Sequence, residues 1–515
     1  MVAILDPYGK PFMNDERRAL MSQLNDARSK LMKARYDAAQ AVDATENHWS
    51  QADHLDPHSA ASAKVRKTLR SRSRYEVLEN NPFLKGVLLT LCNDFVGTGP
   101  KLKITDKRLS PDRRRAIEKR WLQWSQKIKL RQKLWRMRLA KITDGETFAR
   151  AYTNPKLMKK FPIGLDFQVL EADRVSSEYI FPVMREGTNN EIDGVRFDGY
   201  ENPLEYHVLH SHPGSSLLWN ILSQRAGGTW IDEKLIVHWF RQDRGWLRGI
   251  PETTPSLPLC AILRRYTLAM LRHAEISAAF TAIIETENPG ATNPWTDGQG
   301  TQLLEDPFDV FPIEMGMITN VPWGYKMKQF NPVPLGDQFD SYVGAMLRLI
   351  VRPLLAPWNI AAGTSKESNM ASAVVDQDIY KGGQKAERLD CNEDVLDPMV
   401  ELFWAEGTRT SGFFGDEFLQ SDPQFRDNAP EHRWRWDRIG LDHTDPMKVA
   451  KALVELRTNL HITDADIQEE YFNRDVDDWR EEIAEDEEFR SQFVPEPPEP
   501  EGATEDEPEE EPVPA

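Results

Sequence analysis

The 515-residue sequence is poor in cysteine, with only Cys92, Cys260 and Cys391. They lie far apart, and no two of them form a C-x-x-C pair. This spacing excludes a disulfide framework and gives no zinc or iron–sulfur motif, and it is typical of a reducing compartment. We therefore expect three buried, unreactive thiols.

Long apolar runs are also missing. No stretch reaches the roughly 18 apolar residues that a membrane-spanning helix needs. The first 18 residues, MVAILDPYGKPFMNDERR, have neither a basic start nor a long apolar core, so they do not resemble a secretory signal. We predict that the protein has no membrane partner.

Motifs of enzyme chemistry are absent as well. The sequence nearest to a phosphate-binding loop, Gly363-Thr364-Ser365-Lys366, lacks the first glycine of that motif and follows no predicted strand. Neither H-E-x-x-H nor G-x-S-x-G occurs. His432, His443 and His461 stand near many aspartates but without metal-ligand spacing. We predict no catalytic residues, no metal and no cofactor, and hence no enzyme.

Charge is distributed unevenly along the chain. The formal net charge is −18, but residues 464–515 carry 22 acidic side chains against three arginines. Residues 64–141 carry 23 lysines and arginines against six acidic side chains. Net acidity therefore does not exclude a nucleic-acid partner, because such a footprint is local. The segment after Phe493 is mostly Pro and Glu, which predicts disorder.

Hydrophobic periodicity predicts an α+β fold. Asn81 and Pro82 begin a helix that Gly97 ends, and Ile117, Trp121 and Trp124 share one face of the next helix. Another basic helix covers 130–143; its charges either face solvent or contact a nucleic acid or an acidic partner. Two-residue alternation then predicts strands within 146–240.

The second half contains long helical runs. Residues 258–284 form an uninterrupted run of about 40 Å, and 337–352 form another that Pro353 ends. The segment 285–335 between them is irregular, and 356–369 and 408–445 are predicted loops. A third run from Met370 towards Trp404 should be kinked or broken at Gly382-Gly383 and Pro398. Helices at 446–459 and from about 463 to 489 follow.

Five segments, in order, resemble the lambda family of tailed-phage portal proteins. They are NNPFLKGVLLTLCNDFVGTG (80–99), Asp144-Gly145-Glu146 with its strands, LEADRV (170–175), IVHWFRQDRGWLRGIP (236–251) and VRPLLAPWNIAAGTSKESNMASA (351–373). Each segment alone is a weak signal, whereas their common order is specific. Val374 departs from the family pattern, which has a basic residue there.

The resemblance implies a portal-type fold and a ring-forming subunit, usually in twelve copies. Its parts would be an N-terminal helix or arm (1–63), an α/β wing (64–250), stem helix 1 (251–284), a small clip (285–335), stem helix 2 (336–355), a tunnel loop (356–369), a long kinked helix returning to the wing (370–439), a helical crown (440–490) and a disordered acidic tail (491–515).

The resemblance also implies the function and the partners. The ring would sit at one capsid vertex of the virion, be assembled in the host cytoplasm, pass double-stranded DNA during packaging and ejection, and dock terminase, a head–tail adaptor and the major capsid or scaffold protein. We expect the tunnel loop to contact DNA through Asn359, Thr364, Ser365, Lys366 and Glu367. Among these residues, Lys366 is expected to be the main phosphate contact. We expect Arg264, Arg265, Arg272 and Arg348 to pair with the adjacent subunit.

Two other functions fit the same residues. A monomeric DNA-binding scaffold, or another part of a viral packaging machine, would also use the basic segment; a central hole in the assembled particle would distinguish a ring from it. A nuclease or ATPase of the packaging apparatus is disfavoured by the missing phosphate-loop residues.

Overall fold

A computed structural model describes residues 55–177, 190–214, 228–279, 283–286, 325–328, 337–363, 370–414, 425, 428–437 and 446–460, with a few positions between 463 and 487. The chain divides into two compact units, residues 1–436 and 437–515. Most of the expected N-terminal helix or arm (1–63), most of the clip, residues 364–369 and the acidic tail lie outside the described residues.

The first helices confirm the predicted start of the folded part. They are α2 (Pro57–Ala60), α3 (Ala63–Ser73), the π-helical η2 (Arg74–Asn80) and α4 (Pro82–Val96). The Asn81 side chain accepts a hydrogen bond from the Leu84 amide and so caps α4. Gly97 ends α4 with a φ of 55°, a conformation that favours glycine.

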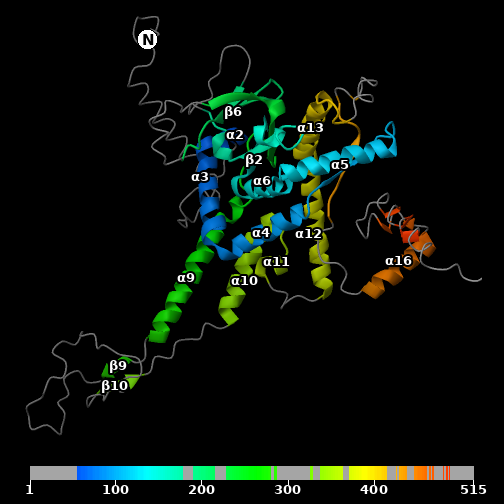
Figure 1. Cartoon of the computed structure of the whole chain (residues 1–515). Helices are drawn as coiled ribbons and strands as arrows, with labels where there is room; N and C mark the ends of the chain where they lie inside the picture. The colour runs from blue at the N-terminus through cyan, green and yellow to red at the C-terminus, as the bar shows by residue number, and fades with distance from the viewer. Residues whose placement is uncertain are drawn as a thin grey trace, which may run out of the picture. The chain divides into compact units, whose positions relative to one another are not determined.

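Two antiparallel sheets follow (Figure 1). One has the order β3-β2-β8 and the other β4-β5-β6-β7. Their strands are β2 (Glu146–Thr153), β3 (Leu165–Leu170), β4 (Asn190–Ile192), β5 (Val195–Phe197), β6 (Pro203–Leu209), β7 (Gly228–Asp232) and β8 (Ile236–Phe240). Short elements between them are α7 (Pro155–Met158), η3 (Ala172–Arg174) and η4 (Glu233–Leu235). The predicted alternation is confirmed, and the fold is mixed α+β.

An aromatic core packs beside the first sheet, where α5 (Pro111–Lys127), α6 (Leu130–Asp144) and α13 (Asp397–Arg409) meet. The predicted buried face of α5 is confirmed, since Ile117, Trp121 and Trp124 are all buried. Trp121 packs edge-on against Phe403 and Trp124 packs against it at a tilt, with ring centroids 5.1 and 4.9 Å away. Helix α13, which lies far from α5 in the sequence, thus completes the core that α5 and α6 begin.

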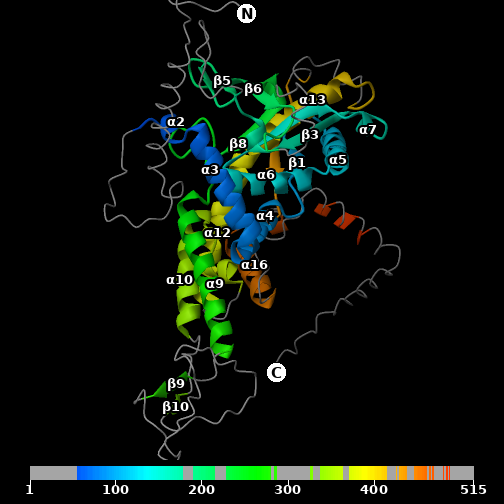
Figure 2. The same ribbon diagram turned by 90° about the vertical axis from the view of Figure 1, so that its left-hand side faces the viewer.

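Two long helices lie side by side below this body (Figure 2). They are α9 (Leu257–Ala279), preceded by η5 (Thr254–Ser256), and α10 (Asp337–Val351), followed by η6 (Arg352–Leu354). The expected helix 258–284 is too long, because Ile283 and Ile284 belong to strand β9 (Ile283–Thr286), paired with β10 (Tyr325–Lys328). The expected second helix is confirmed, with Pro353 in the 3-10 turn that ends it.

Three further predictions need correction. The expected loop 356–369 contains a short helix, α11 (Trp358–Ala362). Gly382-Gly383 does not interrupt α12 (Met370–Cys391), which passes through the π-helical η7 (Asn392–Leu396) into α13 (Figure 1). The expected loop 408–445 contains strand β11 (His432–Arg435), which pairs with β1 (Lys101–Ile104).

The second unit contains α16 (Pro446–Leu460), as predicted. The helix expected from about 463 to 489 is described at only a few positions, which are helical from Asp464 on. None of the helices among the described residues has the length and apolar character needed to cross a membrane.

Candidate functional site

Three of the segments that resemble portal proteins meet in one buried charge cluster. Glu146, at the start of β2, is fully buried. Its carboxylate accepts hydrogen bonds from Arg248 at 2.7 and 2.8 Å, from Arg70 and from the Gly249 amide at 3.1 Å. The third segment contributes through Val175, whose carbonyl accepts a hydrogen bond from Arg248 at 3.1 Å.

Helix α3 and its π-helical extension supply the remaining cations. Arg66, Arg70 and Arg74 recur at four-residue spacing and so lie on one helix face. Arg66 pairs with Asp193 at 2.6 Å, Arg70 pairs with Asp173 at 3.2 Å, and Arg74 binds Asp144 through two bonds of 2.7 and 2.8 Å. These three cations of the basic stretch 64–74 are therefore neutralised by internal ion pairs.

The cluster keeps the carboxylates of Glu146 and Asp193 ionised. Burial by itself raises the pKa of Glu146, but Arg248 and Arg70 outweigh burial and hold that pKa well below its ordinary value. Burial acts on Asp193 in the same way, and Arg248 with Arg66 lowers its pKa to about 2. Burial lowers the pKa of His238, whose ring nitrogen lies 3.1 Å from Glu146. A buried cluster with balanced charges suits a structural junction.

The two glycines of these segments allow their backbones to touch. Gly145 has a φ of 87°, and a Cβ atom there would lie 2.1 Å from the Ile250 carbonyl carbon. A Cβ atom at Gly249 would lie 2.1 Å from the Gly145 carbonyl oxygen. Both positions therefore require glycine for this close approach.

A second buried cluster joins α6 to distant parts of the chain. Arg138 binds Glu252, in the segment before α9, at 2.8 Å. Lys141 pairs with Glu387 on α12. Both cations are buried, so neither of the two functions predicted for the charges of this helix, solvation or contact with a partner, applies to these two positions.

The four arginines predicted to reach an adjacent subunit lie in different surroundings. Arg264 makes two hydrogen bonds, of 2.9 and 2.8 Å, to Glu76 of its own chain. Arg265 and Arg272 are exposed on α9 and form no ion pair with any residue that the structure describes. Arg348 is exposed on α10, with its guanidinium 4.4 Å from the centre of the Trp358 ring.

The predicted DNA-contacting loop is described only in part. Asn359 lies in α11, is half-buried, and its side-chain oxygen accepts a hydrogen bond from the Ile360 amide at 2.9 Å. Gly363 ends this helix in the left-handed conformation. Thr364, Ser365, Lys366 and Glu367 lie outside the described residues.

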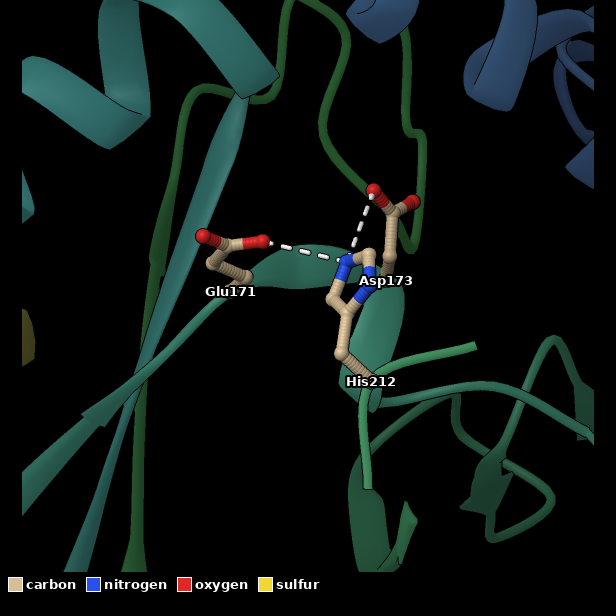
Figure 3. Close-up of side chains that lie close together, drawn as sticks. All are labelled: Glu171, Asp173 and His212. Carbon is tan, nitrogen blue, oxygen red and sulfur yellow. Dashed lines mark ion pairs between the residues drawn. The ribbon is translucent and has the colours of Figure 1, made fainter. Parts of the chain in front are cut away.

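One group of side chains among the described residues has the composition of a metal site: Glu171, Asp173 and His212 (Figure 3). The His212 Nε2 atom lies 3.1 Å from Glu171 and 3.9 Å from Asp173. However, His212 Nδ1 accepts a hydrogen bond from the Gly214 amide at 3.0 Å. A neutral ring that accepts at Nδ1 carries its proton on Nε2, and this nitrogen then has no lone pair to offer a metal ion.

Asp173 is also held by two cations, with Arg70 at 3.2 Å and Arg74 at 2.8 Å. Positive neighbours disfavour a metal ion at the same carboxylate. The geometry therefore fits an ion-paired edge of the buried charge cluster better than a metal centre.

Comparison with known proteins identifies the class of protein to which the chain belongs. The chain belongs to the family described as "Phage portal protein, lambda family", whose profile matches residues 46–375. A "Probable portal protein" of Halomonas phage phiHAP-1 is 24% identical over 480 residues, which cover 88% of this chain and 86% of that protein. The family assignment makes the chain a portal protein, a structural and non-enzymatic component of the virion, as the sequence predicted.

Solved structures of gene transfer agent (GTA) particles also resemble the chain. The structure titled "Neck of empty GTA particle computed with C6 symmetry" has a TM-score of 0.40 at 11% identity, covering 78% of this chain and 92% of that one. The structure titled "Virion of native gene transfer agent (GTA) particle" has a TM-score of 0.37 at 11% identity, with the same coverage.

Proposed function

We propose that this portal protein forms a closed ring of about twelve copies at one capsid vertex. The ring is the channel for packaging and ejecting the genome. The membership of the chain in the portal family is the single observation that carries this proposal. The ring also serves as the docking platform for terminase, a head–tail adaptor and the major capsid or scaffold protein.

Each proposed part of the ring subunit corresponds to a segment of the chain. Residues 64–250 form the wing, α9 and α10 the stem, 285–335 the clip, 356–369 the tunnel loop, 370–439 the return to the wing, and 440–490 the crown. Tyr266 on α9 stacks on Phe339 of α10 and packs at a tilt against Tyr342, with ring centroids 5.9 and 4.4 Å away, which supports a two-helix stem.

The stem surface supports contact with a second copy. Leu268 and Leu271 on α9 and Leu349 on α10 are 48%, 58% and 59% exposed. Isolated exposed leucines are ordinary, but a ring closes by repeating one heterologous interface that can cover such side chains. Arg265 and Arg272 then pair with carboxylates of the neighbouring subunit, whereas Arg264 is already satisfied by Glu76.

The tunnel loop contacts DNA weakly, because the duplex must slide. Every phosphate that a protein neutralises adds salt-dependent affinity, so a tunnel works with few cations. Lys366 and Glu367 give the loop segment 364–369 no net charge. Lys366 is the phosphate contact, and Asn359, Thr364 and Ser365 line the passage.

The proposal is tested first by particle mass. Twelve copies of 59.2 kDa have a combined mass of about 710 kDa, which light scattering on the eluate of a sizing column measures directly. A stable monomer that binds DNA, in the presence of the capsid and scaffold proteins, would contradict the ring and favour the monomeric DNA-binding scaffold.

The tunnel loop is tested by Lys366→Glu. We expect rings of normal mass that package or retain less DNA, measured as nuclease-protected genome per particle, with Lys234→Glu, an exposed cation of η4, as the matched control. Normal packaging by Lys366→Glu rings would remove the DNA contact from this residue and leave the ring proposal intact.

A further inference from the structure

Helix α12 buries its polar face and exposes its apolar face. The buried face carries Tyr380, Gln384 and Arg388 at four-residue spacing. The Tyr380 hydroxyl donates a hydrogen bond to Asp94 on α4 at 2.8 Å. Arg388 donates two more to backbone carbonyls of α4, at 2.8 and 3.0 Å. A helix at the surface of a lone subunit normally has the opposite arrangement, with its apolar stripe turned towards the core.

The exposed face of α12 carries a regular apolar stripe. Its members follow one another in steps of four and three residues: Val375, Ile379, Gly382, Ala386 and Leu389. The three large side chains are 59%, 56% and 60% exposed, and a Cβ atom at Gly382 would meet nothing within 4 Å. Alternating steps of four and three are the pattern with which one helix packs along another. We call these five residues the α12 stripe.

Helix α9 has an exposed face at the other end of the same row of helices. Helix α9 packs on α10 through Tyr266 and Tyr342, and α10 packs on α11 through Trp358. Helix α11 packs on α4, and α4 contacts α12. Figure 1 shows α9 and α12 on opposite sides of this row. Two complementary faces at opposite ends of a subunit repeat head to tail, and such a repeat forms a ring when its rotation closes.

The two faces carry opposite charges. The exposed leucines of α9 lie beside Arg265 and Arg272, which are exposed and form no ion pair with any residue that the structure describes. Asp376 and Asp390 directly follow the first and last residues of the α12 stripe, and they too are exposed without an ion pair among the described residues. The other flank of the stripe carries one aspartate and one lysine, which cancel. Charges beside an apolar seam select the partner helix through interhelical ion pairs.

We propose that the α12 stripe packs against the exposed face of α9 in the next copy of the chain. This inference rests on the proposed ring and names the surface that covers the leucines of its stem. Burial of both apolar faces stabilises the assembly, and the ion pairs at their edge set the register. The arginines of α9 lie seven residues apart and the aspartates of α12 fourteen, so one aspartate meets one arginine in a given register. The row of helices then continues from each subunit into the next.

Cysteine cross-linking tests this contact directly. Leu268→Cys and Ala386→Cys place one thiol on each face, and a short bis-maleimide joins thiols that lie close together. We expect the double variant to give covalent chains of many subunits on a denaturing gel, because each subunit is linked to the next around the ring. The three natural cysteines are buried. Neither single variant should form such a ladder, and neither should the control pair Leu268→Cys/Tyr200→Cys, whose second site is 88% exposed between β5 and β6.

Charge reversal tests the polar edge of the contact. Arg265→Glu/Arg272→Glu should raise the protein concentration at which half of the chains are assembled by about tenfold, measured by light scattering. The matched control Lys234→Glu/Arg244→Glu reverses two exposed cations elsewhere and should leave that concentration unchanged. An equal effect in the control would attribute the loss to net charge and overturn the contact.

Compensation gives a readout that a loss of folding would not produce. Either Asp376→Arg or Asp390→Arg, added to the reversed α9 face, should restore assembly, and the variant that does so identifies the register. Rings of normal mass without the covalent ladder, or a reversed face that neither change compensates, would overturn this contact and leave the ring intact. A wild-type chain that stays monomeric with the capsid and scaffold proteins present would overturn the ring, and this contact with it.

Discussion

At the residue scale, several basic side chains form ion pairs inside the subunit and do not face a partner. Arg66, Arg70 and Arg248 are buried and pair with Glu146 or Asp193, although Arg66 and Arg70 lie in the basic stretch 64–141, whose composition suits binding of a polyanion. Sequence similarity marked Asp144-Gly145-Glu146 and Arg248-Gly249 as shared with the family, but it could not pair them. Contacts across about a hundred residues depend on the sheet register, which no local pattern encodes.

Removal of the Glu146 charge should destabilise the part of the fold that contains the two larger sheets. Glu146→Gln leaves Arg70 and Arg248 buried without their shared counter-charge, and breaking a buried pair costs about 3–5 kcal/mol. Urea titration followed by tryptophan fluorescence measures the change. Asp243→Asn, which breaks the exposed Arg241–Asp243 pair, is the control and should change stability by less than about 1 kcal/mol. A Glu146→Gln protein as stable as the control would show that the cluster is dispensable.

Acid should weaken the cluster in two windows. Because burial lowers the pKa of His238 below 6.5, the unfolded chain takes up that proton more readily, and stability is lost as the pH falls below about 6.5. Glu146 and Asp193 have lowered pKa values in the folded state. Their contribution is full above about pH 4 and is lost as the pH falls towards 2.

Thermal midpoints measured between pH 8 and pH 3 test both windows. His238→Gln should remove the first loss and keep the second, because the amide does not titrate. A wild-type midpoint that stays constant from pH 7 to pH 5 would contradict the buried, neutral state of His238.

At the scale of elements, hydrophobic periodicity predicted the helices well, because α4, α5 and α10 each bury one regular stripe. Strand β11 was missed because its four residues alternate charge with aromatics inside a segment rich in turn residues, and its partner β1 lies more than 300 positions earlier. The end of α9 was also misplaced, since Ile283 and Ile284 suit a helix or a strand equally.

The glycines show why a break was wrongly expected in α12. A Cβ atom at Gly382 would meet nothing within 4 Å, and the helix continues through it. Gly382→Ala should therefore stabilise the protein by up to about 1 kcal/mol. Gly145→Ala should destabilise it by several times that amount, because the Cβ would collide with the backbone at Ile250. Thermal unfolding of the two variants should shift in opposite directions, and a shift of the same sign would contradict these backbone environments.

At the scale of the whole molecule, internal ion pairs connect segments that the proposed ring assigns to the wing, the stem and the return helix. Glu76 of η2 holds Arg264 of α9, and Arg138 and Lys141 of α6 hold Glu252 and Glu387. These contacts join η2 to α9, and α6 to the segment before α9 and to α12, within one subunit. The proposed tunnel loop rests only on resemblance to the family, because its small, mixed residues carry no periodic signal of their own.

Electron microscopy of the full-length protein in moderate salt tests the central claim most directly. The account predicts closed rings of about twelve subunits around a channel wide enough for duplex DNA, with residues 356–369 facing the channel. Compact DNA-binding particles without a central hole, obtained in the presence of capsid and scaffold proteins, would contradict it.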